Sequence, residues 1–178
     1  YLTNDLVTFS VTPSIDNSTN IGYKLFYEAQ TWPVARDKCE DDGAKLAVPK
    51  SMDEFLFMRK IVRKMHYSSI VGSSYKILVW LGINNLDDYR VWKNIDGENI
   101  EDTGFAFWST GNGEGYSDAP EEPHCAGLDA VSWLRDFWCH LAEPYLMTSY
   151  SNLPNTSFLL SVPPLRPTSL SVSHYSLK

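Results

Sequence analysis

The stretch from Val79 to Cys139 constrains the fold of this chain more than any other segment. Its markers are Val79-Trp80-Leu81-Gly82-Ile83, Phe107-Trp108, Cys125-Ala126-Gly127-Leu128 and Asp136-Phe137-Trp138-Cys139. A long acidic loop containing glycine and proline separates Trp108 from Cys125. A rigid, cross-linked frame that presents one long polar loop is typical of a recognition module. Enzymes more often converge several catalytic side chains in one cleft.

The size and charge of the chain exclude some classes of partner. Its 178 residues suit one domain with extensions, and 43% hydrophobic residues are enough to form a core without a metal. The net charge of −7 argues against nucleic acid or an anionic membrane as the main partner. The basic run at residues 59–64 is the local exception, and we expect it to be a solvated helix face. No apolar stretch approaches the roughly 20 residues of a membrane span.

Several features suggest a secreted protein. The chain opens at Tyr1 without a methionine, as expected for a mature protein whose leader has been removed. Asn17 and Asn155 stand in glycosylation sequons. Of the three cysteines, Cys125 and Cys139 are close enough to clip the base of the acidic loop, which leaves Cys39 alone. Cys39 then has a missing partner, an intermolecular bond, or the role of an inert buried thiol, and the sequence leaves all three open.

The pattern of secondary structure predicts an α+β fold. Strands are expected at residues 22–27, 44–48, 76–82 and 90–92, with an Asp96-Gly97 hairpin turn after the last of these. A first helix is expected from the Thr31 cap to Gly43, with Cys39 facing inward. A second helix begins at the Ser51-x-x-Glu54 capping box. Strands that follow one another with short turns favour an antiparallel sheet.

Together, these residues resemble a C-type lectin-like domain. The motifs that carry the likeness are Trp32-x-x-Ala35-x-x-x-Cys39, Gly43-Ala44-x-Leu46-Ala47, Trp80-Leu81-Gly82, Cys125-x-x-Leu128 and Asp136-x-x-Cys139. The likeness implies two helices, antiparallel sheets and a long loop over residues 22–147, and it extends to secreted arthropod lectins of the haemolymph. Residues 1–21 are expected to form an arm, either loose or as an edge strand. Residues 148–178 are expected to be a poorly ordered Ser/Pro-rich tail, or alternatively to pack on the domain through Phe158, Leu159 and Leu160.

The resemblance implies a Ca²⁺ ion in the long loop that coordinates sugar hydroxyls, but the motifs differ here. The family's Glu-Pro-Asn or Gln-Pro-Asp is replaced by Asn112-Gly113-Glu114, and its Trp-Asn-Asp by Leu134-Arg135-Asp136. Arg135 would repel a cation, and the carboxylate expected just before Cys125 is displaced to Glu122. Calcium requires six to eight oxygen ligands.

The candidate metal ligands are therefore Asn112, Glu114, Glu122 and Asp136, and Asp118 and Glu121 extend the acidic cluster. The alternative is an acidic, solvated loop without metal. The candidate ligand-binding residues are Asn112, Glu114, Asp118, Glu122, Arg135 and Asp136. The resemblance also places the family's fourth cysteine at Met147, so the bond from Cys39 to the last strand is absent.

These observations favour two functions and argue against a third. The first is a secreted recognition protein that binds a glycan or a protein through the long-loop surface, with doubtful calcium dependence. The second is a structural subunit of an extracellular assembly, attached through its tail and through Cys39 as a homo- or hetero-oligomer. An enzyme is not expected, because His66, His124, His140 and His174 show no link to a nucleophile, and the adjacent Glu121 and Glu122 point apart.

Overall fold

The computed structural model describes residues 13–113 and 122–150. Glu114, Asp118, Glu121, Asn155 and the predicted tail lie outside the described residues. Two α-helices and eight strands are present in the described part. They are α1 (Trp32–Asp41), α2 (Met52–Arg63), β1 (Ser14–Asp16), β2 (Ile21–Gln30), β3 (Lys45–Leu46), β4 (Val79–Asn84), β5 (Lys93–Asn94), β6 (His124–Leu128), β7 (Leu134–Trp138) and β8 (Glu143–Tyr150). A 3₁₀ turn, η1, spans Tyr67–Ser69. The predicted α+β class is confirmed.

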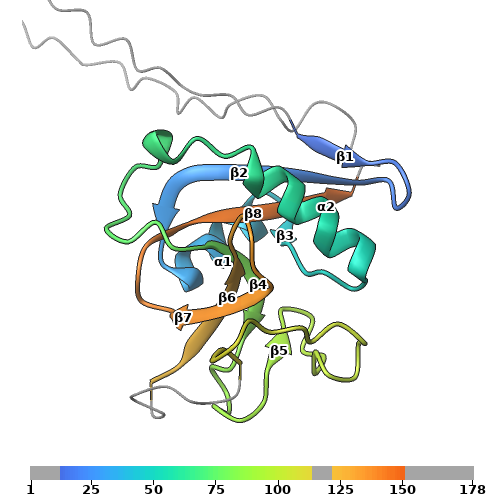
Figure 1. Cartoon of the computed structure of the whole chain (residues 1–178), viewed down its shortest axis with the longest axis vertical. Coiled ribbons are helices and arrows are strands. Elements are labelled where there is room, and N and C mark those ends of the chain that lie inside the picture. Colours follow the sequence, from blue (N-terminus) through green and yellow to red (C-terminus); the bar gives the residue numbers. More distant parts are fainter. Residues whose placement is uncertain (1–12, 114–121, 151–178) are drawn as a thin grey trace, which may run out of the picture.

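The strands form one mixed sheet in the order β1-β2-β8-β4-β6-β7, with β3 paired to β8 and β5 paired to β4. All pairs are antiparallel except β4 with β8, which are parallel at Trp80 and Tyr145. Figure 1 shows the long β2 and β8 together with α1 and α2 at one end of the molecule, and β5 with the β4–β6–β7 strands at the other. The long loop connects to this second end.

Local sequence signals account for both helices. Ser51 Oγ accepts a hydrogen bond from the Glu54 N–H (3.2 Å), and Glu54 Oε2 accepts one from the Lys50 N–H (2.7 Å). This reciprocal arrangement satisfies backbone donors at the start of α2. Helix α1 begins at Trp32 with Pro33 in its first turn, and Gly43 follows its end with a φ of +69°. The left-handed conformation at Gly43 is the one that terminates a helix at low cost.

The core consists of two clusters of buried side chains. The larger cluster lies between α2 and the sheet and includes Phe55, Leu81 and Phe105. The smaller cluster lies between α1 and the sheet and includes Trp32, Cys39, Trp80, Cys125, Cys139 and Met147. Strand β4 contributes to both clusters, and Gly82 lets it lie close to Leu46 and Val48. A Cβ at Gly82 would come within 2.9 Å of both Leu46 O and Val48 Cγ2. The Trp80-Leu81-Gly82 motif is thus two core anchors followed by a close backbone approach.

The predicted Cys125–Cys139 disulfide is confirmed, and it joins β6 to the end of β7. Cys39 is free and completely buried, so the interpretation as an inert thiol fits the structure. Burial raises the pKa of the Cys39 thiol to about 12, which keeps it protonated at neutral pH. The burial of Cys39 argues against a bond from this thiol to another chain while the domain is folded, because no part of its side chain reaches the surface.

The strand predicted at residues 90–92 is wrong, since the strand in this region is β5 at Lys93–Asn94. Asp88 accounts for the difference. Its side chain accepts a hydrogen bond from the Arg90 N–H (2.9 Å), and its carbonyl accepts one from the Val91 N–H (2.9 Å). These contacts hold residues 88–91 in a turn, as aspartate side chains commonly do. The predicted strand at residues 44–48 is shortened to Lys45–Leu46.

The ends of the described region belong to the sheet. β1 is an edge strand paired to β2, so the edge-strand alternative for the arm holds for Ser14–Asp16. Asn17 is exposed in the turn between β1 and β2. β8 pairs with β2 as far as Tyr150, opposite Ile21. The boundaries at residues 21 and 147 otherwise remain predictions.

Candidate functional site

Two tryptophans support the start of the long loop. The Trp92 and Trp108 rings lie 4.6 Å apart, and Trp92 Nε1 donates to the carbonyl of Gly113 (2.8 Å). Gly113 has a φ of +75°, and a Cβ at this position would overlap the Trp108 ring. The backbone therefore passes directly over Trp108, and only glycine fits there. This packing explains why Gly113 stands where the family has proline.

Asn112 is held next to β7 by its amide. Asn112 Oδ1 accepts a hydrogen bond from the Asp136 N–H (3.1 Å), and Asn112 Nδ2 donates to the Thr110 carbonyl (3.1 Å). The structure thus brings together two of the predicted site residues, Asn112 and Asp136. The contact uses the oxygen of Asn112 and the backbone of Asp136, which leaves the Asp136 carboxylate for a different partner.

That partner is His124. His124 Nδ1 lies 2.8 Å from Asp136 Oδ2, and each side chain is only 11% exposed. His124 pairs with Trp138 across β6 and β7, so Asp136 is its diagonal neighbour on the same face of the sheet. The backbone N–H of His124 donates a hydrogen bond to Oδ1 of the buried Asn85 side chain (2.7 Å), which fixes the start of β6. The histidine–aspartate pair was not predicted from the sequence.

Arg135 does not join Asn112 and Asp136. Arg135 Nη1 donates to Asp129 Oδ2 (3.2 Å). Successive residues of a strand point to opposite faces, so Arg135 and Asp136 diverge. Burial opposes ionisation of Asp129, but hydrogen bonds from Ser132, Val131 and Arg135 prevail and lower its pKa. The repulsion of calcium by Arg135 stays a prediction.

The described donors do not suit calcium. In residues 13–113 and 122–150, no three His, Cys, Asp or Glu side chains gather closely enough to hold a metal. Glu122 is exposed and does not contact the Asn112–Asp136 pair through any hydrogen bond. Asn112 Oδ1 and Asp136 Oδ2 both already have protein partners. Calcium requires several oxygens directed at one point, which these residues do not provide.

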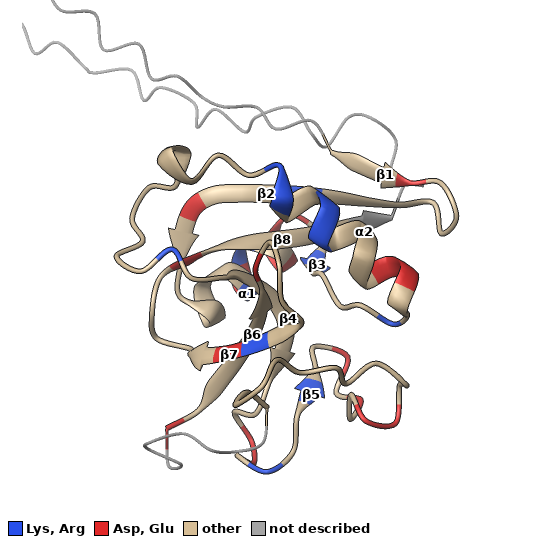
Figure 2. Cartoon of the chain, in the orientation of Figure 1, with Lys and Arg blue, Asp and Glu red and all other residues tan. Residues whose placement is uncertain are grey.

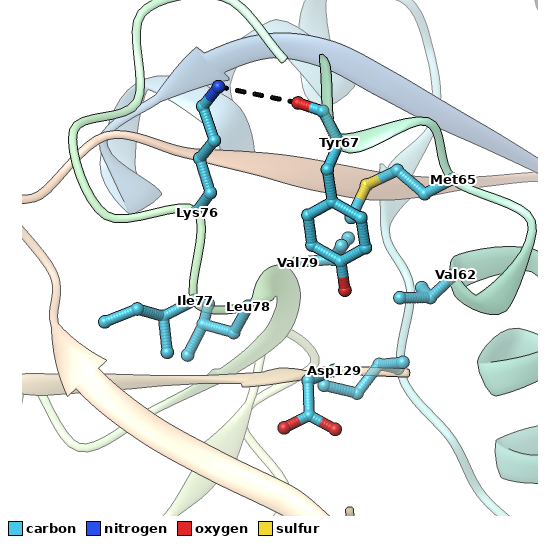
Figure 3. A pocket seen from close by; sticks show the side chains of 9 residues that line it. Val62, Met65, Tyr67, Lys76, Ile77, Leu78, Val79 and Asp129 are labelled. Atoms are coloured by element: carbon cyan, nitrogen blue, oxygen red, sulfur yellow. Dashed lines mark hydrogen bonds between the residues drawn. The ribbon is translucent and has the colours of Figure 1, made fainter. Parts of the chain in front are cut away.

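A shallow depression lies between the end of α2 and the start of β4. Figure 3 shows the Tyr67 ring above its apolar walls, with the hydrogen bond from Lys76 Nζ to the Tyr67 carbonyl (3.5 Å) at its rim. The side chains leave no space for a sphere the size of a water molecule. The depression is therefore a packing defect of the core edge and not a ligand site.

Residues 28–146 match the family described as the C-type lectin domain. This range covers most of the chain, including both helices, the disulfide and the His124–Asp136 pair. The chain belongs to the C-type lectin domain family. The resemblance drawn from the sequence is confirmed. C-type lectin domains are in general binding proteins, and this one is related to carbohydrate-binding lectins.

A relative with a described ligand is the hemolymph lipopolysaccharide-binding protein of Periplaneta americana. It is 23% identical over 138 residues, which are 77% of this chain and 52% of the relative. The chain thus spans about half the length of the curated relative that it matches.

Solved C-type lectin domains share the fold at low identity. The human scavenger receptor C-type lectin domain has a TM-score of 0.61 at 22% identity, over 79% of this chain and 99% of its own. The mouse scavenger receptor domain has a TM-score of 0.60 at 21% identity, over 76% and 92%. A calcium-independent type II antifreeze protein has a TM-score of 0.57 at 18% identity, over 78% and 91%.

His124 directly precedes Cys125, and Asp136 lies three residues before Cys139. In the observed register Cys125 faces Phe137 and His124 faces Trp138, a pairing that the spacing of the cysteines does not fix by itself. Asp136 then follows as the diagonal neighbour of His124.

None of the helices in the described ranges is long and apolar enough to cross a membrane.

Proposed function

We propose that this C-type lectin domain is a secreted recognition module that binds a microbial-surface glycan through the long-loop face without a resident calcium ion. The observation that carries the proposal is the His124–Asp136 contact of 2.8 Å. Asp136 is the one carboxylate of the family's calcium motif that this chain retains within the described residues, and it already has His124 as its partner. The contact leaves Asp136 Oδ2 with a protein partner in place of a metal ion.

The geometry supports recognition by a preformed face. The Trp92–Trp108 pair, the Asn112 clamp and the disulfide all fix the backbone around the loop. Ordering the site before binding reduces the entropic cost of association. The Cys125–Cys139 bond is also consistent with an oxidising, extracellular compartment.

The nature of the ligand is supported by the relative from Periplaneta americana, whose name describes lipopolysaccharide binding. Because identity to this relative is 23%, the ligand is carried over as a proposal. A protein ligand remains the alternative outcome of the experiment below. The structural-subunit function loses the attachment point at Cys39, since that thiol is buried.

Retention of the purified chain on surfaces coated with lipopolysaccharide, mannan or no glycan tests the proposal. We expect retention on a glycan surface to be the same with calcium and with EDTA. Asp136→Asn should weaken it at least tenfold, because the charge of the His124 pair is removed. Asp37→Asn, an exposed carboxylate on α1, is the matched control and should have no effect.

Two results would contradict the proposal. Loss of retention in EDTA with recovery in calcium would show that a metal site forms with residues outside the described ranges. Retention on no glycan surface, together with capture of a defined protein ligand that Asp136→Asn abolishes, would assign the face to protein binding.

A further inference from the structure

A second surface, which shares no residue with the Asn112, His124 and Asp136 group, combines exposed aromatic rings with arginines. We call it the arginine–aromatic face, and it consists of Arg59, Arg63, Phe107, Val131 and Trp133. Val131, Phe107 and Trp133 expose 78%, 48% and 37% of their surface. Large apolar side chains are usually exposed singly, so three together indicate a contact surface.

The exposed rings are supported from below. Trp133 stacks on the buried Phe55 with ring centres 5.5 Å apart, and Phe107 lies edge-on to the buried Phe105 at 5.4 Å. Phe107 and Trp133 are themselves 5.8 Å apart. Because both rings rest on core aromatics, the face is rigid before any ligand arrives. Rigid aromatic side chains provide contact area at low conformational cost.

Two arginines of α2 extend across to the β6–β7 turn. The Arg59 guanidinium lies 5.3 Å from the Phe55 ring centre and 5.4 Å from that of Trp133, and its Nη1 donates to the Ser132 carbonyl (3.4 Å). Arg63 Nε donates to the Ala130 carbonyl (2.7 Å). Arg59 is thus fixed beside the Trp133 ring, and Arg63, one helical turn further along α2, is fixed to the same turn at Ala130. Stacking and multiple donors are what distinguish arginine from lysine at binding sites.

These arginines have no carboxylate partner among the described residues. The ion pairs of the described region involve other cations: Arg36, Lys38, Lys45, Lys50, Lys93 and Arg135, besides His124. The acid on the adjoining turn, Asp129, is engaged by Ser132 and Arg135. Figure 2 shows the resulting concentration of basic residues in the second half of α2, in a chain whose net charge is −7.

Helix stability alone accounts for part of this pattern. Asp53 and Glu54 in the first turn of α2 and basic residues in its last turn complement the helix dipole. The dipole does not explain why Arg59 stacks on Trp133 or why Phe107 and Val131 remain exposed beside it. Lys60, Arg63 and Lys64 are exposed, as the interpretation of residues 59–64 as a solvated face expects, whereas Arg59 is half-buried.

We propose that the arginine–aromatic face binds a saccharide carrying a phosphate or sulfate group. The apolar side of a sugar ring would lie on Trp133 and Phe107, and the anionic group would accept hydrogen bonds from Arg59 and Arg63. Charge-assisted bonds of this kind are stronger than neutral ones. An anionic membrane fits less well because the remainder of the chain is acidic. A protein partner fits less well because stable interfaces bury about 800 Å² on each side, more than one helix face and one turn offer.

Calorimetric titration of the whole chain with soluble probes tests this face separately from the long loop. The probes are a phosphorylated glucosamine disaccharide, a sulfated disaccharide, neutral chitobiose and inorganic phosphate. We expect at least one of the two anionic disaccharides to bind, at least tenfold more tightly than chitobiose and inorganic phosphate. Which of the two binds distinguishes phosphate from sulfate. Affinity should fall as salt is raised.

Variants locate the binding. Arg63→Gln should lower the affinity at least tenfold, while Arg36→Gln on α1 should leave it unchanged. Trp133→Ala should also weaken binding, with folding checked by its melting curve. Asn112→Ala should have no effect, so that the long-loop proposal and this one fail independently.

Several outcomes would overturn the inference. These are no binding of either anionic disaccharide, binding of inorganic phosphate as tight as that of the disaccharides, or equal losses in Arg63→Gln and Arg36→Gln. Binding to phosphatidylglycerol vesicles without binding to the disaccharides would assign the face to a lipid surface instead.

Discussion

The framework beneath the loop and the loop face itself are held by different kinds of contact. In the framework, Trp32 Nε1 donates to the Leu81 carbonyl (2.6 Å), Trp80 Nε1 donates to the Gln30 carbonyl (3.0 Å), and both rings are buried. On the loop face, Asp136 accepts the His124 side chain at its carboxylate (2.8 Å) and donates its N–H to Asn112 Oδ1 (3.1 Å). The framework is set by many buried contacts, whereas ligand chemistry depends on a few polar atoms. The fold can therefore persist while the ligand changes.

The largest effect is expected from Trp32→Ala. Trp32 is buried, its side chain bonds to β4, and its N–H donates to the Cys139 carbonyl (3.0 Å). Removing a buried tryptophan side chain should lower the free energy of unfolding by about 3–5 kcal/mol. Denaturant unfolding measures the change.

The matched change on the loop face is Asn112→Ala, which should cost no more than about 1 kcal/mol because Asn112 contacts few atoms. Equal losses in the two variants would show that the loop face carries as much stability as the framework.

The Cys125–Cys139 bond lies at the boundary of the two regions. Replacing both cysteines with alanine removes a cross-link between residues 14 apart in sequence. A loop of this size should contribute about 3 kcal/mol. We expect the melting temperature to fall and glycan retention to fall with it, as measured by calorimetry and surface binding. Unchanged retention in a folded double variant would mean that the bond does not position the loop face.

Adding a disulfide between Cys39 and the last strand is the converse of removing the Cys125–Cys139 bond. Cys39 and Met147 pack in the same buried cluster, and β8 passes beside α1 there. Met147→Cys should allow a bond across a loop of about 100 residues and increase the free energy of unfolding by about 2 kcal/mol, below the entropic limit of about 4.7 kcal/mol. The gain should disappear in reductant. A loss under both conditions would show that the methionine packing outweighs the cross-link.

Gly113→Ala changes the loop without touching the framework. The new Cβ would overlap the Trp108 ring, and alanine disfavours a φ of +75°. The expected cost is about 1–2 kcal/mol, with displacement of the Gly113 carbonyl from Trp92. Tryptophan fluorescence and unfolding report the change, and Gly97→Ala is a control with an open site and φ of +83°. A similar fluorescence change in both variants would point to backbone strain alone.

The framework was accessible from the sequence because its signals are local. Ser51 and Gly43 mark helix ends through their own backbone neighbours, and the Cys125–Cys139 pair is close in sequence. The turn at Asp88 was missed since a side-chain oxygen competed with a strand pattern. Local propensity alone does not show which of the two wins.

The loop face was less accessible because it depends on register. His124 meets Asp136 only if Cys125 faces Phe137, and Arg135 reaches Asp129 only after the hairpin closes. Four of the six predicted ligand-binding residues are described, and of these Asn112 and Asp136 meet while Arg135 and Glu122 do not join them. Three-dimensional proximity of single polar atoms is not encoded in residue type or spacing.

The smallest effect tests a charge inside the framework. Glu143 begins β8 and is fully buried; burial raises its pKa above the ordinary carboxyl value, although a hydrogen bond from Ser73 Oγ (3.1 Å) to its Oε2 opposes the rise. Between the ordinary and the raised pKa, the folded chain binds more protons than the unfolded chain at this site. Its contribution to stability is therefore fully present below the ordinary pKa and is lost as pH rises through the raised one.

Glu143→Gln keeps an acceptor for Ser73 and should remove this loss. The melting temperatures of variant and parent should then diverge in favour of the variant as pH rises towards neutrality. Glu101→Gln, with an exposed side chain, should melt in parallel with the parent at every pH. A Glu143→Gln variant that is less stable than the parent at neutral pH would show that the ionised carboxylate stabilises the start of β8.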